Sequence, residues 1–226
     1  TFGLELCENN SEVFDLIDKE IVSPIDANDN GVDIVSLKFK NVKPYMGSRV
    51  FSIFEPTWKE SENFIDQIFK DQIPKIKEVL AREIKVAFDD VSGIKIINDS
   101  YMNSQDKRII ILDQPLPRYL YQQVLSSYKE PIYLVFPSQH GKDYKVEAIS
   151  LSPESMKSRK PFPVSWRGVL NMNFNLENHP SGISGVYFVH NSGFLANLDT
   201  KENALKFAEK ALNYKTSFWK KLLNFK

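Results

Sequence analysis

The chain has 226 residues, of which 42% are hydrophobic and 12% aromatic, so its composition is that of a globular protein and excludes an intrinsically disordered one. Lysine plus arginine equals aspartate plus glutamate at 29 each, which excludes a strongly basic protein but leaves room for a local basic groove. The single cysteine, Cys7, excludes an internal disulfide, and no apolar run reaches membrane-spanning length. We therefore expect an intracellular protein without membrane contacts.

Residues 1–90 are predicted to be mainly helical. Apolar side chains recur with helical spacing over residues 11–22, and Pro24 is expected to end that helix. Residues 25–31 are acidic and rich in turn formers, with Asn30-Gly31 as the strongest turn signal. A longer helical pattern covers residues 60–88, and Pro74 is expected to divide it into two helices.

Residues 91–215 are predicted to form a domain of strands and helices. Short runs rich in β-branched residues predict strands at 94–97, 108–112, 132–136, 144–149 and 186–190. Helices are expected at 117–126 and at 201–212, the second with Asp199 or Thr200 as its N-cap.

A long irregular stretch, residues 151–184, interrupts the predicted sheet, and such stretches in compact domains are usually functional or poorly ordered. Residues 216–226 form a basic, aromatic tail, expected to be a frayed helix end, with a nucleic acid contact as the alternative. The expected fold class is therefore α+β, with a helical N-terminal part followed by a mixed β-sheet and flanking helices.

The loop at residues 158–168 contains Arg159, Lys160 and Arg167 and is stiffened by Pro161 and Pro163. Arginine forks match phosphate oxygens, and prolines lower the entropic cost of ordering such a loop. The alternative interpretation is an ordinary surface loop that is anchored by Trp166.

Two further segments carry polar side chains that could bind an anion or a metal ion. An apolar strand ends in His190-Asn191-Ser192-Gly193 with a helix soon after it, a place where backbone amides can face an anion; the alternative is a histidine satisfied within a plain turn. Asp26 and Asp29 could bind a divalent metal through their carboxylates, although acidic turns are common.

Together these segments resemble the melanocyte proliferating gene family, RNA exonucleases grouped with the DHH-type phosphoesterases and formerly described as metal-dependent protein hydrolases. The resemblance rests on the order and spacing of Arg159, Phe162-Pro163, Trp166-Arg167-Gly168, residues 182–185, Phe188-Val189-His190, Ser192-Gly193-Phe194 and residues 200–205. Residues 25–31, 48–50 and 56–58 resemble family motifs that lie further upstream.

The resemblance implies a C-terminal domain like the DHH-associated one and hydrolysis of RNA phosphodiesters with two divalent metal ions, Mn or Mg. It implies that Asp26, with Asp29 as second choice, completes the metal site. The residues that would bind single-stranded RNA are Arg159, Arg167, Gly168, His190, Ser192 and Gly193. The nucleus or the mitochondrion is the location that the resemblance implies, and otherwise the cytoplasm.

The chain also departs from the family pattern. The family's His-Asn-Gly, His-x-Asp-Glu, Asp-Val-Gly-Gly and Asp-His-His motifs are absent, and Leu195-Ala196-Asn197 stands where the family has a glycine pair. We therefore expect the substrate-clamping, C-terminal part of such an exonuclease, inactive and without bound metal when alone. The alternatives are a non-catalytic interaction module that forms a homodimer and a small-molecule phosphoesterase.

Overall fold

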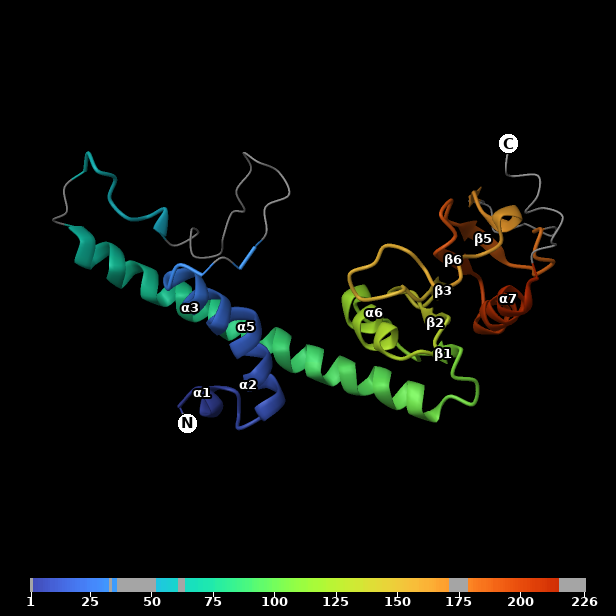
Figure 1. The fold of residues 1–226 in the computed structure, drawn as a ribbon, viewed down its shortest axis with the longest axis horizontal. Coiled ribbons are helices and arrows are strands. Elements are labelled where there is room, and N and C mark those ends of the chain that lie inside the picture. The colour runs from blue at the N-terminus through green and yellow to red at the C-terminus, as the bar shows by residue number, and fades with distance from the viewer. Residues whose placement is uncertain (1, 33, 36–51, 61–63, 171–178, 216–226) are drawn as a thin grey trace. The chain divides into compact units, whose positions relative to one another are not determined.

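The computed structural model describes residues 2–32, 34–35, 52–60, 64–170 and 179–215, and contacts divide the chain into two compact units, Thr1–Ser92 and Gly93–Lys226. The predicted tail at 216–226 lies outside the described residues. The helices of the first unit are α1 Phe2–Leu6, α2 Ser11–Ile17, a π-helical turn Asp18–Val22, α3 Ser23–Asp29 and the first part of α5 Ile65–Asn103 (Figure 1).

The helical segment that begins at Ser11 extends further than its sequence pattern predicts. Asn10 caps α2, because its Oδ1 accepts a hydrogen bond from the Val13 N–H at 3.1 Å. The π-helical turn leads directly into α3, and Pro24 lies in the first turn of α3. Pro24 therefore lies inside a continuous helical run, directly after the π-helical turn in which the spacing of the backbone hydrogen bonds changes. The predicted end at Pro24 is therefore wrong, and the expected acidic turn begins only at Asn30.

α5 is one continuous helix of 39 residues with Pro74 inside it, so the division at Pro74 and the strand at 94–97 are both wrong. Pro74 is exposed, so the helix can accommodate its ring on the solvent side without disturbing buried side chains. Ile97 is fully buried and packs in a cluster with Tyr101 and residues of α6. Burial of this helical face outweighs the preference of its isoleucines for strands.

The second unit contains a six-stranded mixed sheet with the strand order β1-β2-β3-β6-β5-β4. β1 and β2 are parallel, and every other neighbouring pair is antiparallel. The strands are β1 Ile109–Ile111, β2 Tyr133–Pro137, β3 Tyr144–Ala148, β4 Val169–Leu170, β5 Val186–Val189 and β6 Leu195–Leu198. The α+β class and four of the predicted strands are confirmed, whereas β4 and β6 were not predicted.

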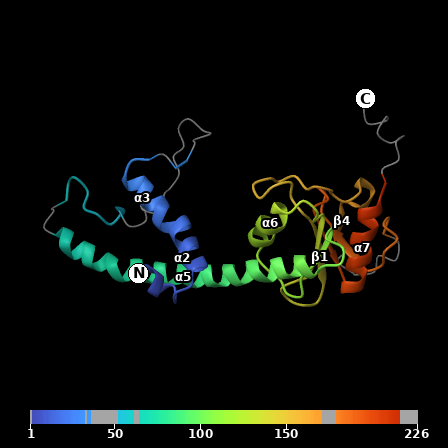
Figure 2. The ribbon, with the colours of Figure 1, turned by 60° about the horizontal axis from the view of Figure 1, so that its bottom comes forward.

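The two faces of the sheet are covered differently. α7, Lys201–Asn213, packs on one face over a core of strand residues that runs from Ile109 to Leu198. α6, Arg118–Ser127, and the end of α5 cover the opposite face at β1 and β2. Figures 1 and 2 show α6 and α7 on opposite sides of the strands. In the described part of the chain, no core cluster covers this second face at β6 and β5.

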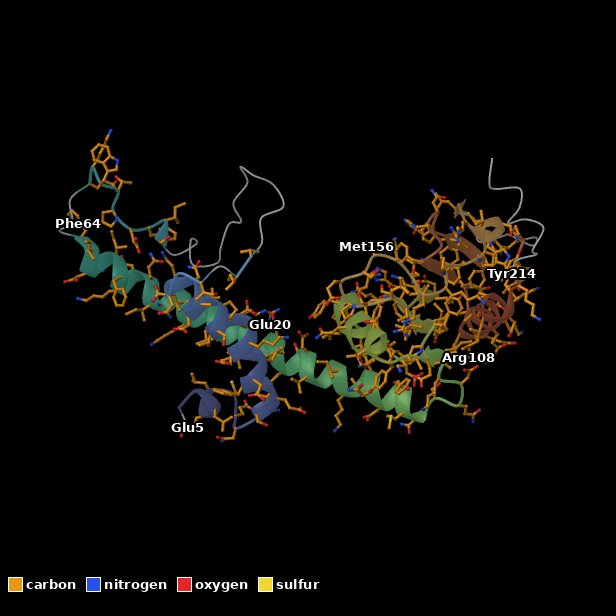
Figure 3. All side chains as sticks on the ribbon, in the orientation of Figure 1. Glu5, Glu20, Phe64, Arg108, Met156 and Tyr214 are labelled. Atoms are coloured by element: carbon orange, nitrogen blue, oxygen red, sulfur yellow. The ribbon has the colours of Figure 1, made fainter. Side chains whose placement is uncertain are left out.

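The predicted helix 201–212 is confirmed together with its cap, since the Thr200 Oγ1 accepts a hydrogen bond from the Asn203 N–H at 3.2 Å. The stretch between β3 and β4 is mostly irregular, as predicted, and Met156 projects from it with 88% of its surface exposed (Figure 3). A three-residue 3-10 helix, Val164–Trp166, precedes β4. Among the helices of the described residues, none is long and apolar enough to cross a membrane.

Candidate functional site

His190 to Phe194 form the turn that joins β5 to β6. The Gly193 N–H donates to the His190 carbonyl at 2.8 Å, and the Ser192 N–H donates to His190 Nδ1 at 3.1 Å. Because a backbone amide can only donate, Nδ1 is the acceptor, and a neutral ring carries its proton on Nε2. In the described residues, no hydrogen bond engages this Nε2.

The same His-x-Ser-Gly turn occurs a second time at residues 179–182. The Ser181 N–H donates to His179 Nδ1 at 3.1 Å, and the Gly182 N–H donates to the His179 carbonyl at 2.7 Å. Here Nε2 lies 3.1 Å from the Trp166 carbonyl, to which it donates, and the ring is 2% exposed. Burial lowers the pKa of His179, although the hydrogen bond to Trp166 opposes this. One copy of the turn therefore uses its Nε2–H inside the protein, whereas no described residue accepts a hydrogen bond from the same donor in the copy at His190.

Trp166-Arg167-Gly168 packs directly against the His190 turn. The Gly168 N–H donates to the Val189 carbonyl at 2.9 Å, and Arg167 Nε donates to the Phe162 carbonyl at 2.8 Å. The Phe162 N–H in turn donates to the Gly193 carbonyl at 2.8 Å. Gly193 has a φ of +75°, and a Cβ at that position would lie 2.5 Å from Arg167 Nε. Two segments that the sequence singled out are thus joined, and Gly193 permits the close approach.

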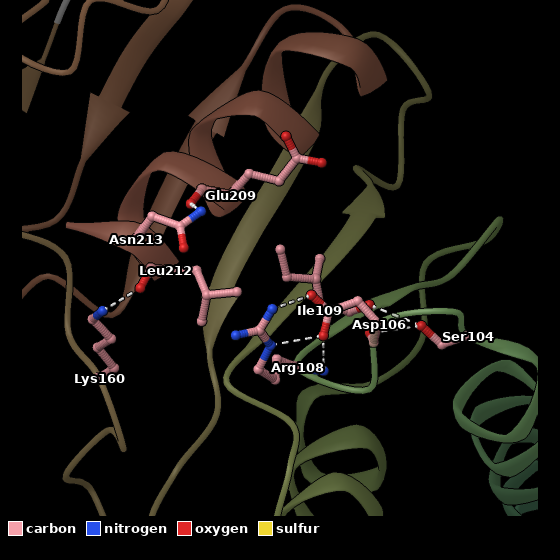
Figure 4. A network of polar contacts seen from close by, with 8 residues as sticks. All are labelled: Ser104, Asp106, Arg108, Ile109, Lys160, Glu209, Leu212 and Asn213. Atoms are coloured by element: carbon pink, nitrogen blue, oxygen red, sulfur yellow. Dashed lines mark hydrogen bonds and ion pairs between the residues drawn. The ribbon is translucent and has the colours of Figure 1, made fainter.

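Arg159 and Lys160 donate hydrogen bonds to backbone carbonyls of the second unit. The three nitrogens of the Arg159 guanidinium donate to backbone carbonyls of Ser126 at 2.6 Å, Pro131 at 2.8 Å and Ser150 at 3.1 Å. Lys160 Nζ donates to the Leu212 carbonyl at the end of α7 at 2.5 Å (Figure 4). Burial lowers the pKa of both side chains. Arg159 thus ties the loop to the end of α6 and to residues next to β2 and β3, and its predicted contact with substrate stays a prediction.

Asp26 and Asp29 lie on α3, where both are exposed. The Asn30 amide donates to Asp26 Oδ1 at 3.2 Å and to the Asp26 carbonyl at 2.8 Å. The described residues contain no group of three or more His, Cys, Asp or Glu side chains that could hold a metal ion. Two carboxylates on one exposed helix do not fit a two-metal centre, so no catalytic step is assigned to a metal in this chain.

The predicted helix N-terminus beside the His190 turn is not there. Strand β6 follows the turn, and α7 begins beyond the far end of that strand. Leu195-Ala196-Asn197, where the family pattern has glycines, belongs to β6 in the interior of the sheet. The turn therefore presents its own N–H groups and the histidine ring, without a helix dipole.

A charged network beside the turn was missed by the sequence analysis. Glu147 on β3 is 2% exposed and accepts hydrogen bonds at 2.7 Å from Arg118 Nε, the Tyr121 hydroxyl and the Gln122 amide. Burial and the neighbouring carboxylate raise the pKa of Tyr121. The sequence shows only a glutamate within the predicted strand 144–149, and this could not identify partners on α6, more than 20 residues away in the chain.

Phe194 connects this network to the turn. The Arg118 guanidinium carbon lies 5.6 Å from the centroid of the Phe194 ring, and the His190 ring centroid lies 4.6 Å from it. The candidate site therefore consists of the His190 turn, Arg167 and Gly168 behind it, and Arg118 on its other side. Of the predicted substrate-binding residues, Arg167, Gly168, His190, Ser192 and Gly193 come together here, and Arg159 lies in the loop between β3 and β4.

Comparison with known proteins gives the family of the chain. Residues 5–212 match the MYG1_exonuc family model, described as "Uncharacterised protein family (UPF0160)". The chain is 28% identical to the MYG1 protein of Schizosaccharomyces pombe, over 93% of this chain and 67% of that protein. It is 28% identical to a MYG1 protein of Caenorhabditis elegans, over 86% and 60%, and 25% identical to the MYG1 exonuclease of Homo sapiens, over 91% and 57%. No solved structure matches. The chain thus spans between about half and two thirds of the length of these relatives, and it belongs to the MYG1 family.

Proposed function

We propose that this chain is the substrate-binding part of a metal-dependent exonuclease that hydrolyses RNA phosphodiesters, and that it holds the phosphate backbone at the His190 turn. The names of the mammalian relatives, MYG1 exonuclease, support a nuclease. The observation that carries the proposal is the contrast between the two His-x-Ser-Gly turns. His179 uses its Nε2–H on a backbone carbonyl, whereas the described residues offer His190 no such acceptor.

A phosphate oxygen is a suitable acceptor for that donor. An imidazole N–H and the guanidinium groups of nearby arginines form charge-assisted hydrogen bonds to phosphate oxygens. Such hydrogen bonds bind a phosphate even where no helix N-terminus faces it. Two backbone hydrogen bonds hold the turn: the Gly168 N–H donates to the Val189 carbonyl, and the Phe162 N–H donates to the Gly193 carbonyl. Because the turn is already ordered, little conformational entropy is lost when a ligand binds. Mn or Mg ions for the hydrolysis would be bound by residues outside the set that the structure describes.

The test is a titration of the chain with fluorescently labelled single-stranded RNA, read by anisotropy at low and at physiological salt. We expect weak binding that salt weakens further, because phosphate contacts release counterions. His190→Asn keeps an acceptor for the Ser192 N–H but removes the Nε2–H, and it should weaken binding several-fold. His140→Asn, at an exposed position, is the matched control and should bind like the unchanged chain.

Absence of RNA binding at low salt would refute the proposal. If light scattering then gives a dimer whose mass does not change on dilution, the chain is instead an interaction module. Equal binding by the His190 and His140 variants would leave RNA binding standing but remove it from this turn.

A further inference from the structure

A partly exposed aromatic surface lies on the sheet next to the His190 turn. Ala196 and Leu198 of β6 are fully buried in the cluster under α7, so Leu195 and Asn197 face the opposite side. Phe188 pairs with Asn197 across the β5–β6 hairpin and is only partly buried. This is the part of the second face that, among the described residues, no core cluster covers.

Three rings form a row on this surface. The Phe188 and His190 centroids are 6.2 Å apart at 66°, and the His190 and Phe194 centroids are 4.6 Å apart at 61°. Each pair is edge-to-face, so the rings do not cover one another's π faces fully. All three side chains are partly exposed. We call Phe188, His190 and Phe194 the aromatic row.

Arg118 stands at the Phe194 end of the row with its guanidinium fixed. Glu147, 3% exposed in its side chain, binds Arg118 Nε, while the Arg118 side chain remains 46% exposed. Within the described residues, no hydrogen bond engages the outer nitrogens of this guanidinium. The arginine is therefore held in one orientation with donors left for a ligand.

The charges of this surface favour an anion. Lys145 of β3 pairs with Asn197 of β6 and so lies on the same face as Arg118 and Glu147. The carboxylate of Glu147 is buried under three donors, and Asp143 accepts hydrogen bonds from the hydroxyls of Ser138 and Tyr187. Both of these acids are thus engaged, as is the exposed Asp199, whose Oδ1 accepts from Asn203 Nδ2 at 2.9 Å, while the cationic groups of Arg118 and Lys145 remain partly exposed.

We propose that this surface is a nucleotide subsite, in which a base of single-stranded RNA stacks on the aromatic row and a phosphate of the same strand binds Arg118. The proposal rests on the proposed function and adds base contacts to the backbone contact at His190. Exposed aromatic side chains on a sheet, bordered by cationic groups, are how several folds bind single strands without strict sequence preference. Double-stranded nucleic acid would not fit, because its bases are already stacked.

The experiment uses the full chain and three oligomers of about eight units, which suits the usual site size for single strands. They are RNA, DNA of the same sequence, and a ribose-phosphate oligomer without bases. Phe188→Leu removes a stacking ring and keeps an apolar side chain, and Arg118→Gln removes the proposed phosphate contact. Phe69→Leu, at an exposed phenylalanine of α5, and Arg108→Gln, at an exposed arginine next to the opposite edge strand β1, are the matched controls.

We expect Phe188→Leu and Arg118→Gln each to lower the affinity for RNA by about tenfold, and the two controls to leave it unchanged. With the oligomer that lacks bases, only Arg118→Gln should have an effect. Since Gln at this position leaves Glu147 without its cation, Arg118→Lys is a second variant, which should fold normally and bind RNA less tightly than the unchanged chain.

If Phe188→Leu, Arg118→Gln and Arg118→Lys bind RNA as tightly as the unchanged chain while His190→Asn binds weakly, the subsite is refuted and the proposed function stands. If the unchanged chain binds no RNA, both are refuted. A loss of affinity in Arg108→Gln as large as in Arg118→Gln would show unspecific charge attraction and would also refute the subsite. Equal affinities for RNA and DNA are compatible with stacking, whereas binding of DNA alone would overturn the assignment to RNA.

Discussion

Replacing Gly193 by alanine tests whether the His190 turn and the Trp166-Arg167-Gly168 segment are packed as tightly as the structure indicates. Gly193 has a φ of +75°, a conformation that costs an alanine about 1–2 kcal/mol. The added Cβ would also lie 2.5 Å from Arg167 Nε and 3.0 Å from its Cζ. Arg167 would have to move and give up its hydrogen bond to the Phe162 carbonyl, which costs about a further 1–3 kcal/mol.

Gly141 offers a matched control. It has a φ of +65° in the turn between β2 and β3, and an added Cβ would meet nothing within 4 Å. Gly141→Ala should therefore cost only the conformational part, about 1–2 kcal/mol. The difference between the two substitutions isolates the cost of displacing Arg167, about 1–3 kcal/mol.

The measurement is urea unfolding followed by the fluorescence of Trp166, which is 1% exposed. Trp58 and Trp219 are replaced by phenylalanine, so that only the second unit's core is reported. In an Arg167→Ala background the clash is gone, and Gly193→Ala should then cost no more than Gly141→Ala. If Gly193→Ala and Gly141→Ala lower the free energy of unfolding equally in the chain that keeps Arg167, the close packing of Gly193 against Arg167 is refuted.

Three further predictions concern the second unit. Thr200→Ala should lower the free energy of unfolding by about 1 kcal/mol, because the α7 cap at the Asn203 N–H is lost; Thr200→Ser should restore most of it. Arg159→Met should cost about 2–4 kcal/mol in the same urea experiment, because three backbone carbonyls lose a charged donor, and a cost below about 0.5 kcal/mol would contradict its structural role. His179 has a lowered pKa in the folded state, so below about pH 6.5 the unfolded chain binds a proton that the folded chain does not. The stability should therefore fall as the pH drops from about 6.5, and this part of the slope should be missing in His179→Gln; an unchanged slope would contradict the assignment.

Local sequence patterns were sufficient where neighbouring residues decide the structure. Thr200 and Asn203 are three positions apart, and together with the apolar stripe that follows they determine where α7 starts. The strands β1, β2, β3 and β5 were predicted because their β-branched runs are continuous. β6 was missed because its four residues include Asn197, and only its position between β3 and β5 makes it a strand.

The spacing of Trp166-Arg167-Gly168 and of the His190 turn was enough by itself to indicate the family, since a motif is a property of the chain. The role of each side chain was decided by residues far away in sequence. Arg159 and Arg167 look equivalent in the loop, yet the structure surrounds Arg159 with three carbonyls and places Arg167 against Gly193. Arg118 carries no motif at all, and only the buried Glu147, 29 residues away, directs its guanidinium toward the His190 turn. Hydrogen-bond partners of this kind are set by packing, which local patterns do not encode.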